Sequence, residues 1–121
     1  MSHRILVVDD EPNIVISLEF LLKKEGYVVA VAGDGEAALQ QAGQFLPDLV
    51  LLDVMMPKKS GFEVCETLRA NPALAGVKIV MLTARGRETE VTKGLALGAD
   101  AYITKPFSTK ELVARIKALL G

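Results

Sequence analysis

Four places along the chain carry side chains that together could perform phosphoryl chemistry. They are the Asp9-Asp10 pair, Asp53, Thr83 and Lys105, and each comes at the end of a short apolar run. If they met, three carboxylates around one ammonium group would leave negative charge that a cation must relieve. Mg²⁺ suits such a crevice, because one or two carboxylates hold it and phosphate oxygens supply further ligands. We therefore expect Asp53 to be a nucleophile that forms an aspartyl phosphate, with the cation, Lys105 and Thr83 neutralising the transferring group.

Each of these residues, taken singly, also fits a structural role. Asp9 and Asp10 could be solvated or helix-capping acids, and Asp53 could be a turn residue. Thr83 could bond local backbone groups, and Lys105 could simply be solvated. The functional interpretation therefore depends on a fold that brings all four places together.

Hydrophobic patterning predicts the elements that must position these residues. Short apolar runs predict five strands, over residues 5–8, 27–31, 49–52, 77–82 and 101–103. Because the apolar residues are consecutive, the runs are typical of parallel strands that are covered on both faces. The segments between them predict five helices, from Pro12 to Gly26, Asp34 to Phe45, Ser60 to Asn71, Arg87 to Leu97 and Ser108 to Leu119.

Local signals refine these helices. Two of them begin with a Ser-x-x-Glu capping box: Ser60 with Glu63, and Ser108 with Glu111. The fourth helix is expected to be the least stable, because Gly94 lies inside it and its apolar stripe is little more than Val91 and Leu95. Cys65 is expected to be a small buried packing residue of the third helix.

Alternating strands and helices predict an α/β fold. Right-handed crossovers favour a doubly wound five-stranded parallel sheet of order 2-1-3-4-5, the flavodoxin-like (βα)5 arrangement. The 121 residues leave no room for a second domain of ordinary size, so residues 1–121 are expected to form one domain. In this order the crevice at the carboxyl ends lies between the first and third strands, which would gather the Asp9-Asp10 pair and Asp53, with Thr83 and Lys105 beside them.

Composition excludes several classes of protein. Fourteen basic and fifteen acidic residues give a net charge of -1, which offers no footprint for nucleic acid or an anionic membrane. One Cys and one His cannot supply the usual zinc site. The apolar runs are much shorter than the roughly 20 residues that span a bilayer, and the start lacks a signal-peptide core. We expect a soluble protein of the reducing cytoplasm, with no membrane partner.

Five stretches of the sequence together resemble the motifs of one protein family. They are Ile5-Leu6-Val7-Val8-Asp9-Asp10-Glu11, Leu51-Leu52-Asp53-Val54-Met55-Met56-Pro57 with Gly61-Phe62-Glu63, Met81-Leu82-Thr83-Ala84, Gly98-Ala99-Asp100-Ala101-Tyr102 and Lys105-Pro106-Phe107. In these stretches the chain resembles the receiver domain of two-component response regulators, from Arg4 to Leu120. The chemotaxis regulator of that family is itself an example of the 2-1-3-4-5 strand order.

The resemblance implies how the acidic residues act. Asp53 matches the phosphoacceptor, which takes a phosphoryl group from a phosphohistidine on a sensor histidine kinase or a phosphotransfer protein. Asp10 matches the carboxylate that binds Mg²⁺ directly, and Asp9 matches the one that acts through metal-bound water. The backbone carbonyl of Met55 is expected to complete the metal site, in which Mn²⁺ can substitute.

The resemblance also implies a switch. Thr83 matches the hydroxyl that turns toward the phosphoryl group, Tyr102 matches the aromatic residue that moves inward with it, and Lys105 matches the lysine that pairs with the group. Pro106 is the cis-proline candidate. The surface of the fourth helix, fifth strand and fifth helix would then change and control a downstream target or an output domain. No direct contact with nucleic acid is expected, and the chain is expected to be a monomer or a phosphorylation-dependent dimer.

Two departures from the family pattern leave alternatives open. Lys58 and Lys59 follow Pro57, where the family often has a Gly that tolerates positive φ, so the course of this loop is undecided. These lysines could raise the positive potential beside the acids or be solvated, and Arg85 could reach the site or face solvent. A stand-alone regulator and a receiver cut from a longer chain fit the sequence equally well.

Two rival functions share parts of this pattern. A Mg²⁺-dependent phosphohydrolase with an aspartyl nucleophile would share the acidic edge, but it usually needs a further acid or base and a cap over its substrate. A nucleotide- or flavin-binding module would place a Gly-rich loop after the first strand, where Asp9-Asp10-Glu11-Pro12 stands instead. Multiple turnover on a phosphate ester would support the first rival.

Overall fold

The computed structural model describes residues 3–56, 59–84 and 88–121, so the expectations about Pro57, Lys58 and Arg85 lie outside the described residues. Within these ranges, five β-strands alternate with five α-helices. The strands are β1 (Arg4–Val8), β2 (Val28–Ala32), β3 (Leu49–Asp53), β4 (Lys78–Ala84) and β5 (Ala101–Lys105). The helices are α1 (Pro12–Lys24), α2 (Gly35–Phe45), α3 (Gly61–Ala70), α4 (Glu88–Ala96) and α5 (Thr109–Leu120), with a 3₁₀ turn at Pro72–Leu74.

The five strands form one parallel sheet of order β2-β1-β3-β4-β5. This confirms the predicted doubly wound, flavodoxin-like fold. The chain passes from β1 through α1 to β2, and from β3 through α3 to β4, so the crossovers diverge between β1 and β3. The carboxyl ends of β1 and β3 therefore flank the crevice in which such folds bind ligands.

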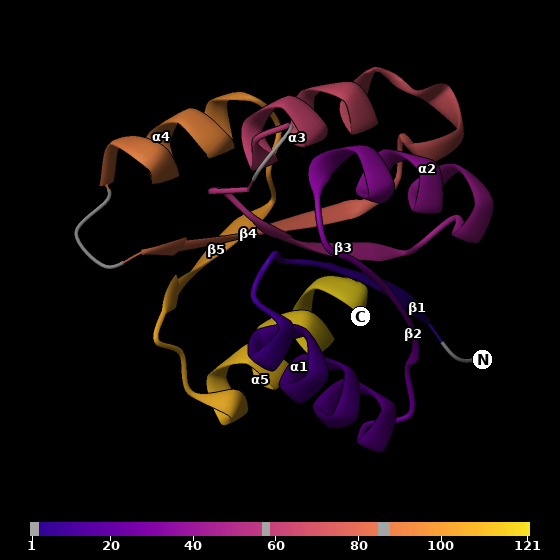
Figure 1. The fold of residues 1–121 in the computed structure, drawn as a ribbon, viewed down its shortest axis with the longest axis vertical. Helices are drawn as coiled ribbons and strands as arrows, with labels where there is room; N and C mark the ends of the chain where they lie inside the picture. The colour runs from indigo at the N-terminus through magenta and orange to yellow at the C-terminus, as the bar shows by residue number, and fades with distance from the viewer. Residues whose placement is uncertain (1–2, 57–58, 85–87) are drawn as a thin grey trace.

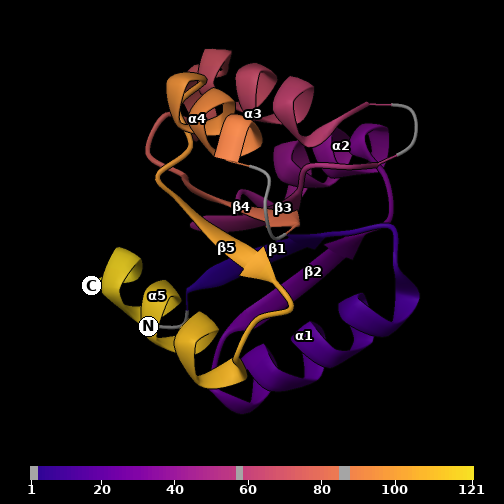
Figure 2. The same ribbon diagram turned by 90° about the vertical axis from the view of Figure 1, so that its left-hand side faces the viewer.

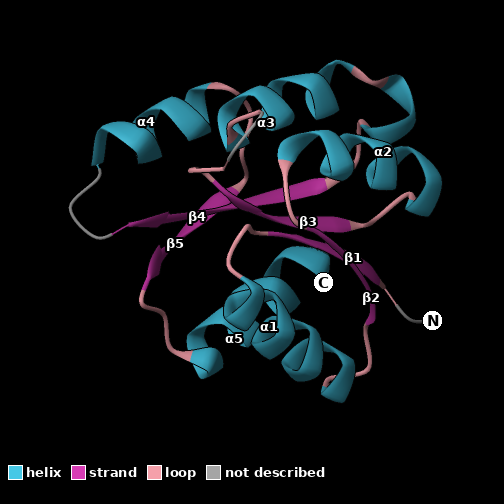
Figure 3. Cartoon of the chain, in the orientation of Figure 1, coloured by secondary structure: helices cyan, strands magenta, loops and turns pink. Residues whose placement is uncertain are grey.

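Helices cover both faces of the sheet. Helices α1 and α5 lie on one face, and α2, α3 and α4 lie on the other (Figures 1 and 2). Figure 3 shows the sheet as the middle layer between them. A hydrophobic core lies on each face of the sheet, and successive residues of β1 point alternately into one and the other. Ile5 and Val7 pack toward α1 and α5, whereas Leu6 and Val8 pack toward α2 and α3. This two-sided burial explains the consecutive apolar residues of the inner strands.

The predicted helix boundaries are largely confirmed. The capping box of Ser60 and Glu63 is present at α3, and Gly26 follows α1 with a φ of +94°. At α5, the Ser108 side chain accepts the Glu111 N–H, which is the first of the two bonds of a capping box. Cys65 is buried as expected, and burial raises the pKa of its thiol. No helix in the described parts of the chain is long and apolar enough to cross a membrane.

The predicted apolar stripe of α4 is wrong in part. Leu95 is 45% exposed, whereas Gly94 is buried against the Met81 and Phe62 side chains. Because Gly94 has no side chain, the helix backbone approaches the sheet at this position and Leu95 turns outward. The face of α4 that packs inward is therefore built around Gly94 and the half-buried Val91.

Candidate functional site

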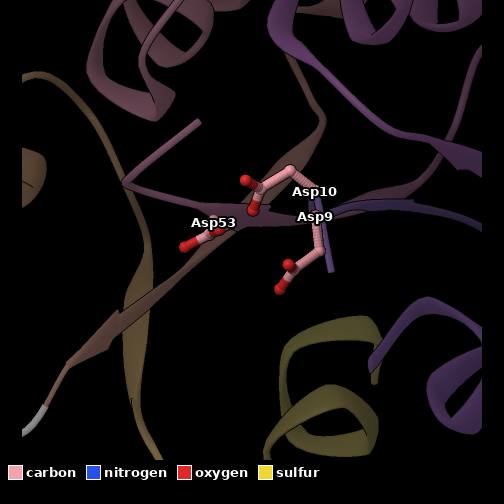
Figure 4. A group of neighbouring side chains, drawn as sticks. All are labelled: Asp9, Asp10 and Asp53. Carbon is pink, nitrogen blue, oxygen red and sulfur yellow. The ribbon is translucent and has the colours of Figure 1, made fainter. Parts of the chain in front are cut away.

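Three carboxylates converge where β1 and β3 end. Asp9 and Asp10 directly follow β1, and Asp53 is the last residue of β3, which pairs with β1. Each offers a carboxylate oxygen, and these oxygens all lie within 4.8 Å of one another. Figure 4 shows the three side chains gathered at this edge of the sheet. The sequence-based prediction that these acids meet at one edge is confirmed by this geometry.

Asp9 is fixed by two hydrogen bonds although it is almost fully buried. Its Oδ1 accepts the Glu11 N–H at 2.9 Å, and its Oδ2 accepts from Lys105 Nζ at 2.7 Å. Asp10, by contrast, is exposed to solvent. The crevice therefore holds one buried acid, Asp9, that is already paired with Lys105, and one acid, Asp10, that solvent or a cation can reach.

Lys105 reaches the acids from the end of β5. Its Nζ lies 2.7 Å from Asp9, 3.5 Å from Glu11 Oε1 and 3.6 Å from Asp53 Oδ1. Burial disfavours the ammonium form, but the hydrogen bond to Asp9 and the charge of Asp53 outweigh it and raise the pKa of Lys105. Lys105 is therefore a fixed positive charge among the carboxylates.

Asp53 is the acid whose protonation is most strongly perturbed. Burial, with the nearby Asp9 charge as a second cause, raises its pKa from 3.8 to about 7, against the opposing influence of Lys105 and the Met55 N–H. That N–H donates to Asp53 Oδ1 at 3.4 Å. A buried carboxylate with such a pKa is costly to ionise without a cation, and this is typical of functional sites.

Thr83 lies in β4, one residue beyond the level of Asp53. The register pairs Asp53 with Leu82 and Thr83 with Thr104. The Thr83 hydroxyl is buried, and among the residues that the structure describes it finds no hydrogen-bond partner. The structural alternative, in which the hydroxyl satisfies local backbone groups, finds no support among the described residues. An unpaired buried hydroxyl is unfavourable, which makes it available to a ligand.

A cavity of about 300 Å³ opens over these residues. Its lining includes Asp10, Asp53, Thr83 and Lys105, together with Glu11 and Glu90. Sequence reasoning missed the last two. Glu11 was detectable because it directly follows the Asp pair, whereas Glu90 lies in a separate helix and only the packing of α4 brings it here.

The turn from β3 into α3 depends on Gly61. Its N–H donates to the Val54 carbonyl at 2.9 Å, so the helix begins directly against the end of β3. A Cβ at Gly61 would collide with the backbone of Asp53 and Val54. On the other side of this loop, the Lys59 backbone lies against Gly35 and its side chain is half-buried. Close backbone packing therefore fixes the position of Asp53.

Of the remaining predicted site residues, Met55 lines the cavity, whereas Tyr102 lies in β5 and Pro106 directly follows that strand. The Met55 side chain is 64% exposed, and Tyr102 on β5 is 37% exposed. The Lys105–Pro106 peptide bond is cis. These positions agree with the expected layout, while the roles expected of the side chains remain predictions.

The donor set suits a hard divalent cation. The three clustered groups are all carboxylates, which hard cations prefer, and exposed Asp10 leaves room for water ligands. The Thr83 hydroxyl, which has no partner in the described part of the chain, adds a polar group at the same cavity. The residues present therefore fit the metal site that the sequence predicted.

Comparisons with known proteins point in one direction. The model of the response regulator receiver domain family matches residues 5–117. The alkaline phosphatase synthesis transcriptional regulatory protein PhoP of Bacillus subtilis is 51% identical over 120 residues, which cover 99% of this chain and 49% of PhoP. The DNA-binding response regulator MtrA of Mycobacterium tuberculosis is also 51% identical, over 99% of this chain and 51% of MtrA.

Solved structures agree. A putative response regulator from Chloroflexus aurantiacus superposes with a TM-score of 0.95 at 39% identity, covering 99% of this chain and 98% of that one. The chain thus spans about half the length of the curated relatives it matches, and nearly the whole of this solved structure.

Proposed function

Since this chain belongs to the response regulator receiver domain family, we propose that it is switched by transfer of a phosphoryl group to Asp53. As a receiver domain it is a phosphoacceptor rather than a turnover enzyme. The observation that carries the proposal is the placement of Asp53. It lies buried between two further carboxylates and Lys105, at a cavity that Thr83 also lines.

In the proposed step, an Asp53 oxygen attacks the phosphorus of a phosphohistidine on a sensor histidine kinase or phosphotransfer protein. An O–P bond forms, the P–N bond breaks, and the leaving imidazole takes up a proton. The ionised carboxylate is the nucleophile, and with a pKa of about 7 it needs a nearby positive charge to ionise readily. Lys105, 3.6 Å from Asp53, supplies part of that charge.

A metal ion would supply the rest. Asp9, Asp10 and Asp53 would hold it, with the Met55 carbonyl as a further ligand, and when bound Mg²⁺ or Mn²⁺ neutralises charge on the transferring phosphoryl oxygens. Asp9 is already engaged by Lys105, so it would act more through water than as a direct ligand. The unpaired Thr83 hydroxyl would donate to a phosphoryl oxygen, and Lys105 would pair with another.

The output of the switch is proposed for the surface formed by α4, β5 and α5. Drawing Thr83 toward the phosphoryl group would make room for Tyr102, which is partly exposed on β5. A population shift of this kind would alter the surface offered to a target or an output domain. PhoP is a transcriptional regulator and MtrA a DNA-binding one, so we propose that an output domain, rather than this chain, contacts DNA in the cytoplasm. In solution we expect a monomer or a phosphorylation-dependent dimer.

Intact-mass measurement tests the proposal. Incubation with acetyl phosphate and Mg²⁺ should add one phosphoryl group to the wild-type chain and none to Asp53→Asn. Asp48→Asn is the matched control, because it makes the same change just before β3, at the far end of that strand. Phosphorylation of Asp53→Asn would overturn the assignment of the nucleophile. Multiple turnover of a phosphate ester would instead favour the phosphohydrolase.

A further inference from the structure

Lys105 is held by a further acid besides the three that cluster at the carboxyl edge of the sheet. Its Nζ donates to Asp9 Oδ2 at 2.7 Å and makes a longer hydrogen bond to Glu11 Oε1 at 3.5 Å. Asp53 Oδ1 lies 3.6 Å from the same Nζ, beyond hydrogen-bonding distance. Glu11, rather than the proposed phosphoacceptor, therefore accepts the second hydrogen bond of the ammonium group.

Glu11 and Asp53 approach Lys105 from different sides. The Glu11 side chain is 61% exposed, whereas that of Asp53 is 9% exposed, so Glu11 lies on the solvent side of the ammonium group and Asp53 on its inner side. Glu11 is also not part of the cluster of three carboxylates whose oxygens lie within 4.8 Å of one another. The position of Lys105 in the unmodified protein is therefore a balance between an outer and an inner carboxylate.

The Glu11 side chain is separate from the contacts that build the turn after β1. Glu11 is the N-cap of α1, but its side chain makes no capping hydrogen bond to the described residues. Its backbone N–H, not its carboxylate, holds Asp9 by donating to Asp9 Oδ1 at 2.9 Å. Exchange of the carboxylate for an amide of the same size therefore weakens the pair with Lys105 and leaves this backbone contact in place.

A phosphoryl group on Asp53 would disturb the balance around Lys105. The group carries close to two negative charges, and Lys105 must advance from its present 3.6 Å to donate to it. Of the two hydrogen bonds that Lys105 makes, the buried one to Asp9 is short, and the exposed one to Glu11 is long. The pair with Glu11 is therefore the one that yields when Lys105 moves inward.

We propose that Glu11 is a positioning residue that holds Lys105 outward, away from Asp53, and releases it when Asp53 is phosphorylated. The proposal rests on the proposed function, since it requires a phosphoryl group on Asp53. It gives the third acid after β1 a role distinct from that of the cation-binding pair before it. Glu11 slows the reaction because it engages the positive charge that the transferring group needs.

The first test compares the phosphorylation rates of wild type, Glu11→Gln and Glu19→Gln with acetyl phosphate and saturating Mg²⁺. Glu19→Gln is the matched control, because it makes the same change within α1, where Glu19 pairs with Lys23 at 3.1 Å. Glu11→Gln should react roughly two- to fivefold faster than wild type, as expected for the loss of an exposed ion pair. Glu19→Gln should match wild type. Equal rates for Glu11→Gln and wild type, or an equal gain for Glu19→Gln, would overturn the inference.

A second test determines whether Glu11 acts through Lys105. In a Lys105→Met background, Glu11→Gln should give no further gain in rate, because the pair that it breaks is already absent. A gain of the same size in that background would mean that Glu11 repels the phosphodonor directly, and the positioning role would be wrong.

A third readout requires no phosphoryl transfer. The NMR signal of the Lys105 ammonium group should be shifted by Glu11→Gln and left in place by Glu19→Gln. Beryllofluoride, a phosphoryl mimic, should then shift this signal less in Glu11→Gln than in wild type, because Lys105 has already turned inward. A signal that Glu11→Gln leaves unmoved would contradict the inference. If the signal moves but wild type gains no phosphoryl group, the proposed function fails instead, so the two failures are distinguishable.

Discussion

At the residue scale, Asp53 combines two properties that conflict in the unmodified protein. It must be ionised to act as a nucleophile, yet burial raises its pKa to about 7. The folded state therefore binds a proton on Asp53 more tightly than the unfolded chain, whose carboxyl has an ordinary pKa of 3.8. Ionised Asp53 therefore destabilises the folded protein, and the site needs a cation before it can react.

This conflict predicts a pH-dependent effect of Asp53→Asn. Because the folded pKa is raised, the wild-type protein loses stability as pH rises from about 4 to about 7, by up to roughly 1.4 kcal/mol per pH unit. The amide cannot ionise and lacks this loss. In urea unfolding with EDTA, the free energy of unfolding of the variant should therefore exceed that of wild type by the most at pH 8. At pH 5 this difference should be smaller by roughly 2 to 3 kcal/mol. A gap that is the same at both pH values would contradict the raised pKa.

Substitutions at Thr83 are predicted to affect stability and switching differently. Thr83→Val removes an unpaired buried hydroxyl at nearly constant volume, so the unmodified protein should be as stable as wild type or more stable by up to about 1 kcal/mol. Thr83→Ser keeps the hydroxyl but loses a buried methyl group, at a cost of about 1 kcal/mol. Thermal unfolding measures both effects. Amide shifts in α4 on adding beryllofluoride should persist in the Ser variant and fade in the Val variant, and the reverse order would refute the role of the hydroxyl.

At the element scale, a glycine holds α3 against the end of β3. The Gly61 N–H bonds to Val54, and a side chain there would collide with the backbone of Asp53. Element boundaries near the site are thus set by close backbone contacts as much as by helix propensity. The capping box of Ser60 and Glu63 then fixes the first turn of the helix.

This packing predicts opposite effects for two glycine substitutions. Gly61→Ala should lower the free energy of unfolding by about 1 to 3 kcal/mol and slow phosphorylation, because the Asp53 backbone must shift. Gly43→Ala, in α2, should raise it by about 0.5 to 1 kcal/mol, since in the described part of the chain nothing beyond the local helix backbone lies within 4 Å of the added Cβ, and alanine favours the helix. Urea unfolding measures both. A neutral Gly61→Ala would show that the turn is less tightly packed than the distances indicate.

At the scale of the whole molecule, charge is distributed unevenly. The net charge is only -1, yet the carboxyl edge of the sheet collects Asp9, Asp10 and Asp53 around Lys105. The fold brings these acids together and so stores electrostatic repulsion at one edge. A cation that binds only the folded state would relieve this repulsion and stabilise the entire domain.

Mg²⁺ is therefore expected to raise the free energy of unfolding. Well above the dissociation constant, each tenfold rise in Mg²⁺ should add about 1.4 kcal/mol, and EDTA should remove the gain. NaCl at matched ionic strength should give a much smaller effect, and Asp10→Asn should shift the dependence to higher Mg²⁺. Thermal unfolding across a Mg²⁺ titration measures this, and equal stabilisation by NaCl would argue against a specific site.

The sequence alone determined the kinds of elements, their order and the strand ends at which the acids, Thr83 and Lys105 lie. Hydrophobic periodicity and capping signals are local, and the crossover rule then limits the sheet to a few arrangements. Only the tertiary structure decided that the Thr83 hydroxyl has no hydrogen-bond partner among the described residues, that Lys105 bonds to Asp9, that Leu95 faces outward and that Glu90 lines the cavity. These features depend on how closely helices approach the sheet, as at Gly94, and residue spacing along the chain does not set that distance.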